Sequence, residues 1–211
     1  MVDSGEDLGG LAEDVGEAYE GLGIADDLDD WATGTIVATM VPLLIGLSIL
    51  QMVSGGVLET FEDVLLEHPA LLVLVPVQIG TAGNLGSIMC SRLSTGLHLG
   101  TFELDPTNQA LRTTAGATFG LGATVFVLVG FASWAIGVAL GGQLGLLEVL
   151  TVSLVSGLLL TVFVIVVSVS AVYSSYRLGY NPDDTTIPVV TNVCDITGVL
   201  ILFAVVSVVI L

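Results

Sequence analysis

Five long apolar blocks, separated by short polar segments, constrain the fold of this chain more than any other feature. They cover residues of about 33–58, 70–90, 113–140, 146–172 and 187–210. A helix needs roughly 20 apolar residues to cross the hydrocarbon core of a bilayer, so each block is long enough to span it. We therefore predict an all-α integral membrane protein with five transmembrane helices, whose first partner is the lipid bilayer.

The charge of the chain narrows its functional class. Charged residues make up only 11% of the 211 residues, whereas a soluble domain has about a quarter. The net charge is −18, with no lysine and three arginines. Because phosphate binding needs clustered basic side chains, nucleic acid is not an expected partner. Acid-rich, lysine-free polar segments are typical of a halophile, where carboxylates keep proteins hydrated and salt screens their repulsion.

The three arginines predict how the chain crosses the membrane. Arg92 and Arg112 lie in the second connection and Arg177 lies in the fourth. With five spans, both connections share a side with the N-terminus. By the positive-inside rule, the N-terminus is inside and the C-terminus is outside. We expect a multi-pass protein of the plasma membrane.

Residues 1–32 form a separate acidic segment before the five-helix transmembrane domain predicted over 33–211. Eleven of the 21 acidic residues fall in the first 30 positions. Apolar residues recur there at helical spacing, which permits one amphipathic cytoplasmic helix. A solvated, partly disordered tail is an equally good interpretation.

The second apolar block contains Pro76, Gly80, Gly83 and Asn84 within one stretch. Proline and glycine at membrane depth favour a kinked or interrupted helix that faces protein or water. Freed backbone carbonyls around Gly83, with the amide of Asn84, would then supply neutral oxygen ligands.

Asp195 is the ionisable residue that lies deepest in an apolar block. It follows Pro188 by seven residues, which places it roughly 10 Å inside the expected helix start. No lysine or arginine lies in any block to pair with it. Such a residue is a functional candidate by default. The alternative is a protonated aspartate that is hydrogen-bonded to neighbouring hydroxyl groups.

Oxygen-bearing residues in the second and fifth blocks suggest a site for a hard divalent cation. Thr191 and Asn192 lie about one turn before Asp195. One carboxylate cannot neutralise a dication, but a twofold dimer with the path on its axis would bring two Asp195 side chains together. The predicted metal-binding residues are Asp195, Asn84, Thr191, Asn192 and Gly83.

Other reactive residues do not form a catalytic pattern. Cys90 and Cys194 lie within apolar blocks and are interpreted as small core residues. Glu148 begins the fourth block and is interpreted as hydrated at the interface. His68 and His98 lie in or near connections. The sequence therefore predicts no enzyme activity and no organic cofactor.

Two runs resemble a known family. The run PVQIGTAGNLGSIMCSRLSTGLHLG is similar to the second spanning helix of the MgtE magnesium transporters and their eukaryotic solute-carrier relatives, and it looks closest to the latter. The run YNPDDTTIPVVTNVCDITGVL resembles the family's entry into the fifth helix. The likeness covers about 33–210.

The resemblance implies a dimer whose cation path lies between protomers and is lined by the second and fifth helices. Asp195 matches the key pore aspartate, Asn84 matches the Asn of the Gly-Asn motif, and Thr191 matches a position used through its backbone. The transported ion would be Mg²⁺, with much of its water shell kept.

Two departures from the family bear on regulation and assembly. MgtE proteins carry a cytoplasmic sensor with CBS domains, whereas only 32 residues precede the first block. The eukaryotic relatives fuse two copies of the unit, so this chain is expected to pair with itself or with a sister chain. Two rival functions remain open: a carrier that couples Na⁺ or H⁺ to cation movement, and a non-conducting subunit of a membrane complex.

Overall fold

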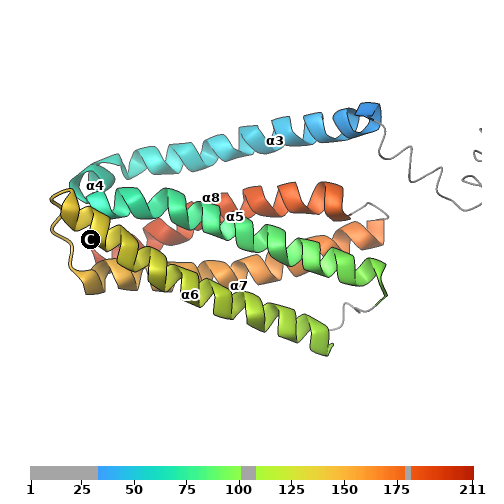
Figure 1. The fold of residues 1–211 in the computed structure, drawn as a ribbon. Helices are drawn as coiled ribbons and strands as arrows, with labels where there is room; N and C mark the ends of the chain where they lie inside the picture. The colour runs from blue at the N-terminus through green and yellow to red at the C-terminus, as the bar shows by residue number, and fades with distance from the viewer. Residues whose placement is uncertain (1–32, 101–107, 179–181) are drawn as a thin grey trace, which may run out of the picture. The chain divides into compact units, whose positions relative to one another are not determined.

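The described parts of the chain, residues 33–100, 108–178 and 182–211 of a computed structural model, are helical and contain no strand. The acidic segment 1–32 lies outside them. The helices, drawn in Figure 1, are α3 (Thr33–Thr60), α4 (Glu62–Glu67), α5 (Pro69–His98), α6 (Gln109–Ala139), α7 (Leu146–Leu178) and α8 (Pro182–Val209). Five of these, all but α4, contain a stretch long and apolar enough to cross a membrane, which confirms the predicted five spans.

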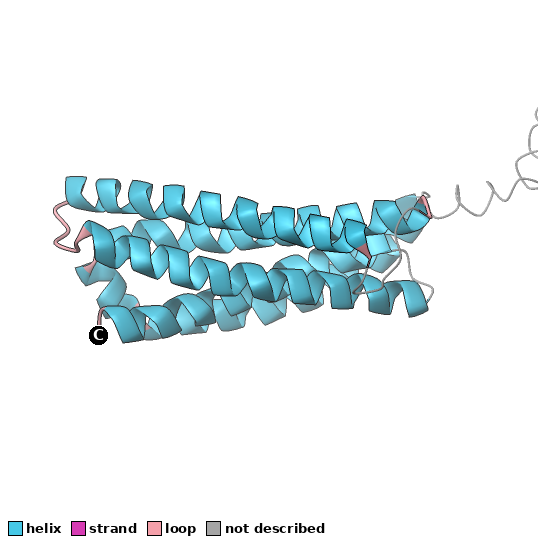
Figure 2. Ribbon diagram, turned by 90° about the horizontal axis from the view of Figure 1, so that it is seen from below, coloured by secondary structure: helices cyan, strands magenta, loops and turns pink. Residues whose placement is uncertain are grey.

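The chain divides into two compact units, residues 1–45 and 46–211, with the boundary inside α3. All contacts described below lie within the second unit. There, α5 packs against α6, α7 and α8, and α7 packs against α6 and α8. Figures 1 and 2 show these four helices running side by side along their lengths.

Several helices are longer than their apolar blocks. α5 continues eight residues past the predicted end at residue 90, and α8 begins at Pro182 rather than near 187. The segment 59–69, predicted to be a connection, contains the short helix α4. An apolar count finds only the hydrocarbon-spanning part of a helix, whereas backbone hydrogen bonding continues into the polar interface.

The second span was predicted to be kinked or interrupted, and it is not interrupted. α5 is one continuous helix from Pro69 to His98, with Pro76 inside it. A transmembrane helix tolerates proline and glycine when neighbouring helices surround it. The carbonyl of Gly83 is not freed, since it accepts a hydrogen bond from Ser87 Oγ at 3.0 Å. Glycine acts here by allowing close helix packing.

Two apolar clusters hold the four packed helices together. One centres on Leu85, Met89, Phe126 and Leu160, and the other on Leu71, Leu74, Leu202 and Phe203. Phe61, between α3 and α4, stacks on Phe203 with ring centroids 4.0 Å apart, which attaches this corner to α8.

Some polar side chains form hydrogen bonds across the helix interfaces. Gln78 of α5 is fully buried, and its Nε2 donates to Ser156 Oγ of α7 at 2.6 Å. Ser153 of α7 donates to the Phe126 carbonyl of α6 at 2.8 Å. Interhelical hydrogen bonds of this kind fix the relative rotation of helices where apolar packing alone is weakly directional.

Candidate cation site

Asp195 lies at the middle of α8, thirteen residues after Pro182 and fourteen before Val209. At 1.5 Å per residue, its backbone is about 20 Å from either helix end. The predicted depth of roughly 10 Å was too small because Pro188 was taken to be the helix start. Pro182 instead begins the helix, where a missing N–H costs nothing, and Pro188 is inside it.

Residues of two helices lie against the Asp195 carboxylate. Oδ2 accepts a hydrogen bond from Gln51 Nε2 of α3 at 3.0 Å. Oδ1 is buried and has no hydrogen-bond partner among the described residues. It faces Gly83 of α5, where an added Cβ would lie 2.9 Å from it. Only a glycine at position 83 allows this approach.

Thr191 lies one turn before Asp195 and contacts the same part of α5. Its Cγ2 would also lie 2.9 Å from a Cβ at Gly83. Its Oγ1 is 3.1 Å from Ser87 Oγ, so these two hydroxyls join α8 to α5. The structure therefore brings together three of the predicted residues: Asp195, Thr191 and Gly83.

The other two predicted residues take different positions. Asn84 is exposed at the middle of α5, on the same side as the exposed Gly80 and Ile88, which lie one turn away in each direction. Asn192 is partly buried, and its Nδ2 donates to the Pro188 carbonyl at 2.9 Å. The Asn192 amide nitrogen is thus used within its own helix.

Among the described residues, Asp195 is the carboxylate of this site. No group of three or more His, Cys, Asp or Glu side chains occurs in the described part of the chain. Other carboxylates lie near helix ends, such as Glu62 at the start of α4 and Glu148, whose Oε2 accepts the Gly145 N–H at the exposed start of α7. That contact is consistent with the interpretation of Glu148 as an interfacial residue.

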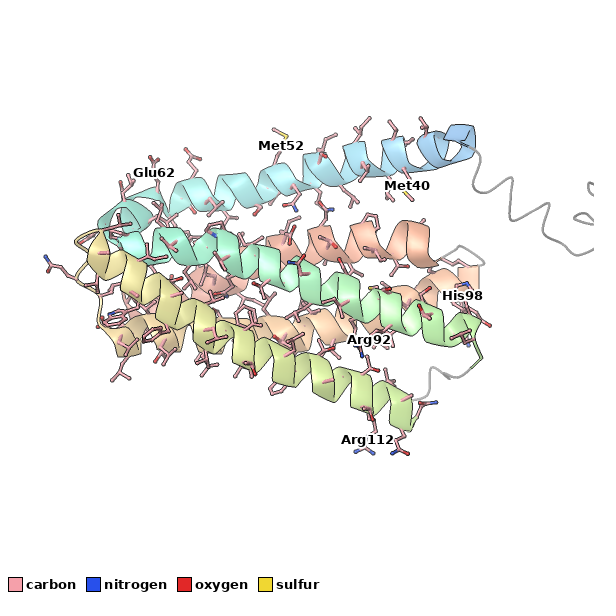
Figure 3. The ribbon with its side chains drawn as sticks, viewed as in Figure 1. Met40, Met52, Glu62, Arg92, His98 and Arg112 are labelled. Atoms are coloured by element: carbon pink, nitrogen blue, oxygen red, sulfur yellow. The ribbon has the colours of Figure 1, made fainter. Side chains whose placement is uncertain are left out.

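Basic side chains lie at the opposite end of the packed helices. Figure 3 shows Arg92 and Arg112 toward the end where α5 finishes and α6 begins, and Glu62 at the other end. Arg177 is in the last turn of α7, where its guanidinium lies over the Tyr173 ring, 4.9 Å from the centroid. The three arginines therefore lie toward the same end of the four packed helices.

Two side chains at the site were not predicted from the sequence. Gln51 is the one amide residue in the first apolar block, and Ser87 follows the Gly-Asn pair by three residues. The rule that polar residues inside spans are functional candidates would have selected Gln51. Ser87 resembles the many serines that bond their own helix.

Comparison with known proteins adds an independent observation. A family model described as MgtE, divalent cation transporter, matches residues 75–205. The magnesium transporter MgtE of Thermus thermophilus is 32% identical over 163 residues, which are 77% of this chain and 34% of that protein. The chain belongs to the MgtE family.

Membership in the MgtE family confirms the resemblance seen in the two motifs. The matched residues 75–205 run from α5 to α8 and contain Gly83, Asn84, Thr191 and Asp195. With its five apolar helices, this MgtE relative is a multi-pass membrane protein of a divalent cation transporter family. The chain spans about a third of the length of the curated relative that it matches. Gln51 precedes the matched residues.

Proposed function

We propose that this chain moves a divalent cation, Mg²⁺, across the membrane along a path lined by α5 and α8. The observation that carries the proposal is the position of Asp195: a carboxylate at the middle of a membrane-length helix, placed against Gly83 and one turn from Thr191. A carboxylate at that depth is costly unless it serves an ion.

The choice of Mg²⁺ follows from the kind and number of ligands. The oxygens near the site are one carboxylate and the Thr191 and Ser87 hydroxyls. Mg²⁺ prefers oxygen, dehydrates reluctantly, and is commonly bound by one or two carboxylates with several waters kept. A sparse oxygen site suits such a hydrated ion. The magnesium transporter from Thermus thermophilus supports the same choice by its similarity.

A dimer with the path on its axis would complete the site. Asn84 is exposed at mid-helix, where contact with lipid would leave its amide without hydrogen bonds. A second copy, or a sister chain, facing this side of α5 would enclose Asn84. It would also bring a second Asp195 close to the first, and two carboxylates balance one dication.

The distribution of charge supports the predicted orientation. Arg92, Arg112 and Arg177 all belong to the end of the bundle at which α5 and α7 finish. By the positive-inside rule, this end of the bundle faces the cytoplasm, and the N-terminus lies on the same side. The membrane would be the plasma membrane. The acidic segment 1–32 would then lie on the cytoplasmic side.

Mg²⁺ flux into liposomes tests the proposal. Asp195→Asn keeps the size of the side chain and removes its charge, so flux at low Mg²⁺ should fall about tenfold or more, as expected for losing a charged partner. Glu148→Gln is the matched control, because it neutralises an exposed carboxylate at a helix start and should leave flux unchanged. Equal flux in the wild-type and Asp195→Asn proteins would contradict the proposal.

The same measurement separates the two rival functions. A wild-type protein without flux would favour a non-conducting subunit. Flux that requires an imposed Na⁺ or H⁺ gradient would favour a coupled carrier. The proposal expects flux that follows the Mg²⁺ gradient and the membrane potential alone.

A further inference from the structure

The inward face of α3 carries a polar residue at the depth of the site. Within residues 46–60, the side chains that are buried or partly buried are Leu47, Gln51, Ser54, Val57 and Leu58, which recur at spacings of four, three and then three or four. This spacing defines one face of a helix. Met52, next to Gln51, is 75% exposed on the outer side. The helix phase therefore directs Gln51 inward.

The hydrogen bond from Gln51 to Asp195 has a fixed polarity. An ionised carboxylate only accepts hydrogen bonds, so the amide must present its nitrogen. The Nε2–Oδ2 distance of 3.0 Å is that of a good hydrogen bond, and it joins residues 144 positions apart. A donor on a charged acceptor is among the stronger hydrogen bonds in proteins.

The two contacts of the carboxylate are unequal, and together they fix its rotation. Oδ1 is buried against Gly83 without a partner, so a cation has no access to it in this arrangement. Asp195 as a residue nevertheless keeps part of its surface exposed. Oδ2 is the oxygen that remains, and it has a second lone pair beyond the one that Gln51 occupies.

We propose that Gln51 is a positioning residue of the cation site. Its amide holds the Asp195 carboxylate with Oδ1 toward Gly83 and Oδ2 free to accept one more partner, a divalent cation or a water of its shell. The first spanning helix thereby contributes to a site whose other described residues lie on α5 and α8. This inference rests on the proposed function of Asp195.

Mg²⁺ flux measured over a range of concentrations separates positioning from a structural role. Gln51→Leu keeps a similar side-chain length and removes the donor. Because the carboxylate is then no longer held, the half-saturating Mg²⁺ concentration should rise about tenfold, with little change in maximal flux. Gln51→Asn keeps the amide but is one methylene too short to maintain the bond, so it should shift half-saturation in the same direction. It is the variant to measure if Gln51→Leu fails to fold.

Met52→Leu is the matched control, since this neighbouring side chain points outward on the same helix and its substitution should change neither parameter. Unchanged half-saturation in both Gln51 variants, or a fall in maximal flux alone, would overturn the positioning role and leave the proposed function intact. A wild-type protein that carries no Mg²⁺ would overturn the proposed function, and this inference with it.

Discussion

Replacing Gly83 with alanine perturbs the candidate site by a single methyl group. The added Cβ would lie 2.9 Å from Asp195 Oδ1 and 2.9 Å from Thr191 Cγ2, whereas ordinary contacts begin at 3.4 Å. The neighbouring atoms must therefore move away by about 0.5 Å, which is the difference between 3.4 Å and 2.9 Å. Both belong to α8, and one of them is the carboxylate.

The expected size of the effect follows from the cost of overpacking. Inserting a methyl group into a close-packed interface costs about 1–3 kcal/mol. If that cost falls on the arrangement that binds the cation, the half-saturating Mg²⁺ concentration rises from about fivefold to more than a hundredfold. Liposome flux over a Mg²⁺ concentration series measures this change directly.

Two other glycines provide controls for Gly83→Ala. A Cβ at Gly86 would lie 3.0 Å from Val190 Cγ1, so Gly86→Ala crowds the same pair of helices without touching Asp195. It should lower thermal stability in detergent and leave half-saturation unchanged. A Cβ at Gly120 of α6 meets nothing within 4 Å, so Gly120→Ala should change neither property. The reasoning is refuted if Gly83→Ala and Gly86→Ala shift half-saturation equally.

Two further predictions concern stability. Ser156→Ala leaves the fully buried Gln78 amide without its partner at 2.6 Å, which should cost about 1–3 kcal/mol in thermal or chemical unfolding. Gln78→Leu removes an amide whose Oε1 already lacks a partner, so it should destabilise less than Ser156→Ala, and the opposite order would contradict this account. Asn108→Ala removes the side chain that accepts the Ala110 and Leu111 N–H groups at the start of α6; it should cost about 1 kcal/mol and speed hydrogen exchange in that first turn, with flux unchanged.

The number of spans could be predicted from the sequence, and Asp195 could be selected as the chief candidate residue, because both inferences depend on local composition. A block of some twenty apolar residues forms an α-helix in a bilayer, because the helix satisfies all of its backbone hydrogen bonds internally. Asp195 stands out within such a block because charge is rare there. The two motifs also placed Gly83 and Thr191 on the correct helices.

The remaining errors came from features that depend on neighbouring helices. Pro76 and the glycines of α5 were read as helix-breaking, but their effect depends on what surrounds the helix, and Gly83 and Gly86 permit α8 to approach. The distance of Asp195 from the helix start was underestimated because α8 begins at Pro182 and Pro188 lies inside it. Gln51 was missed although it is the one amide residue in its apolar block, because nothing in the sequence indicates that this block lies beside Asp195.

The central claim is that two Asp195 carboxylates share one cation path. It is tested most directly with a mixed dimer, in which a wild-type chain and an Asp195→Asn chain carry different affinity tags and are purified through both. If the path lies between the protomers, the mixed dimer has one carboxylate for the dication, and its Mg²⁺ flux should fall far below half that of the wild-type dimer. Half of the wild-type flux would mean that each protomer has its own path, and would contradict the account.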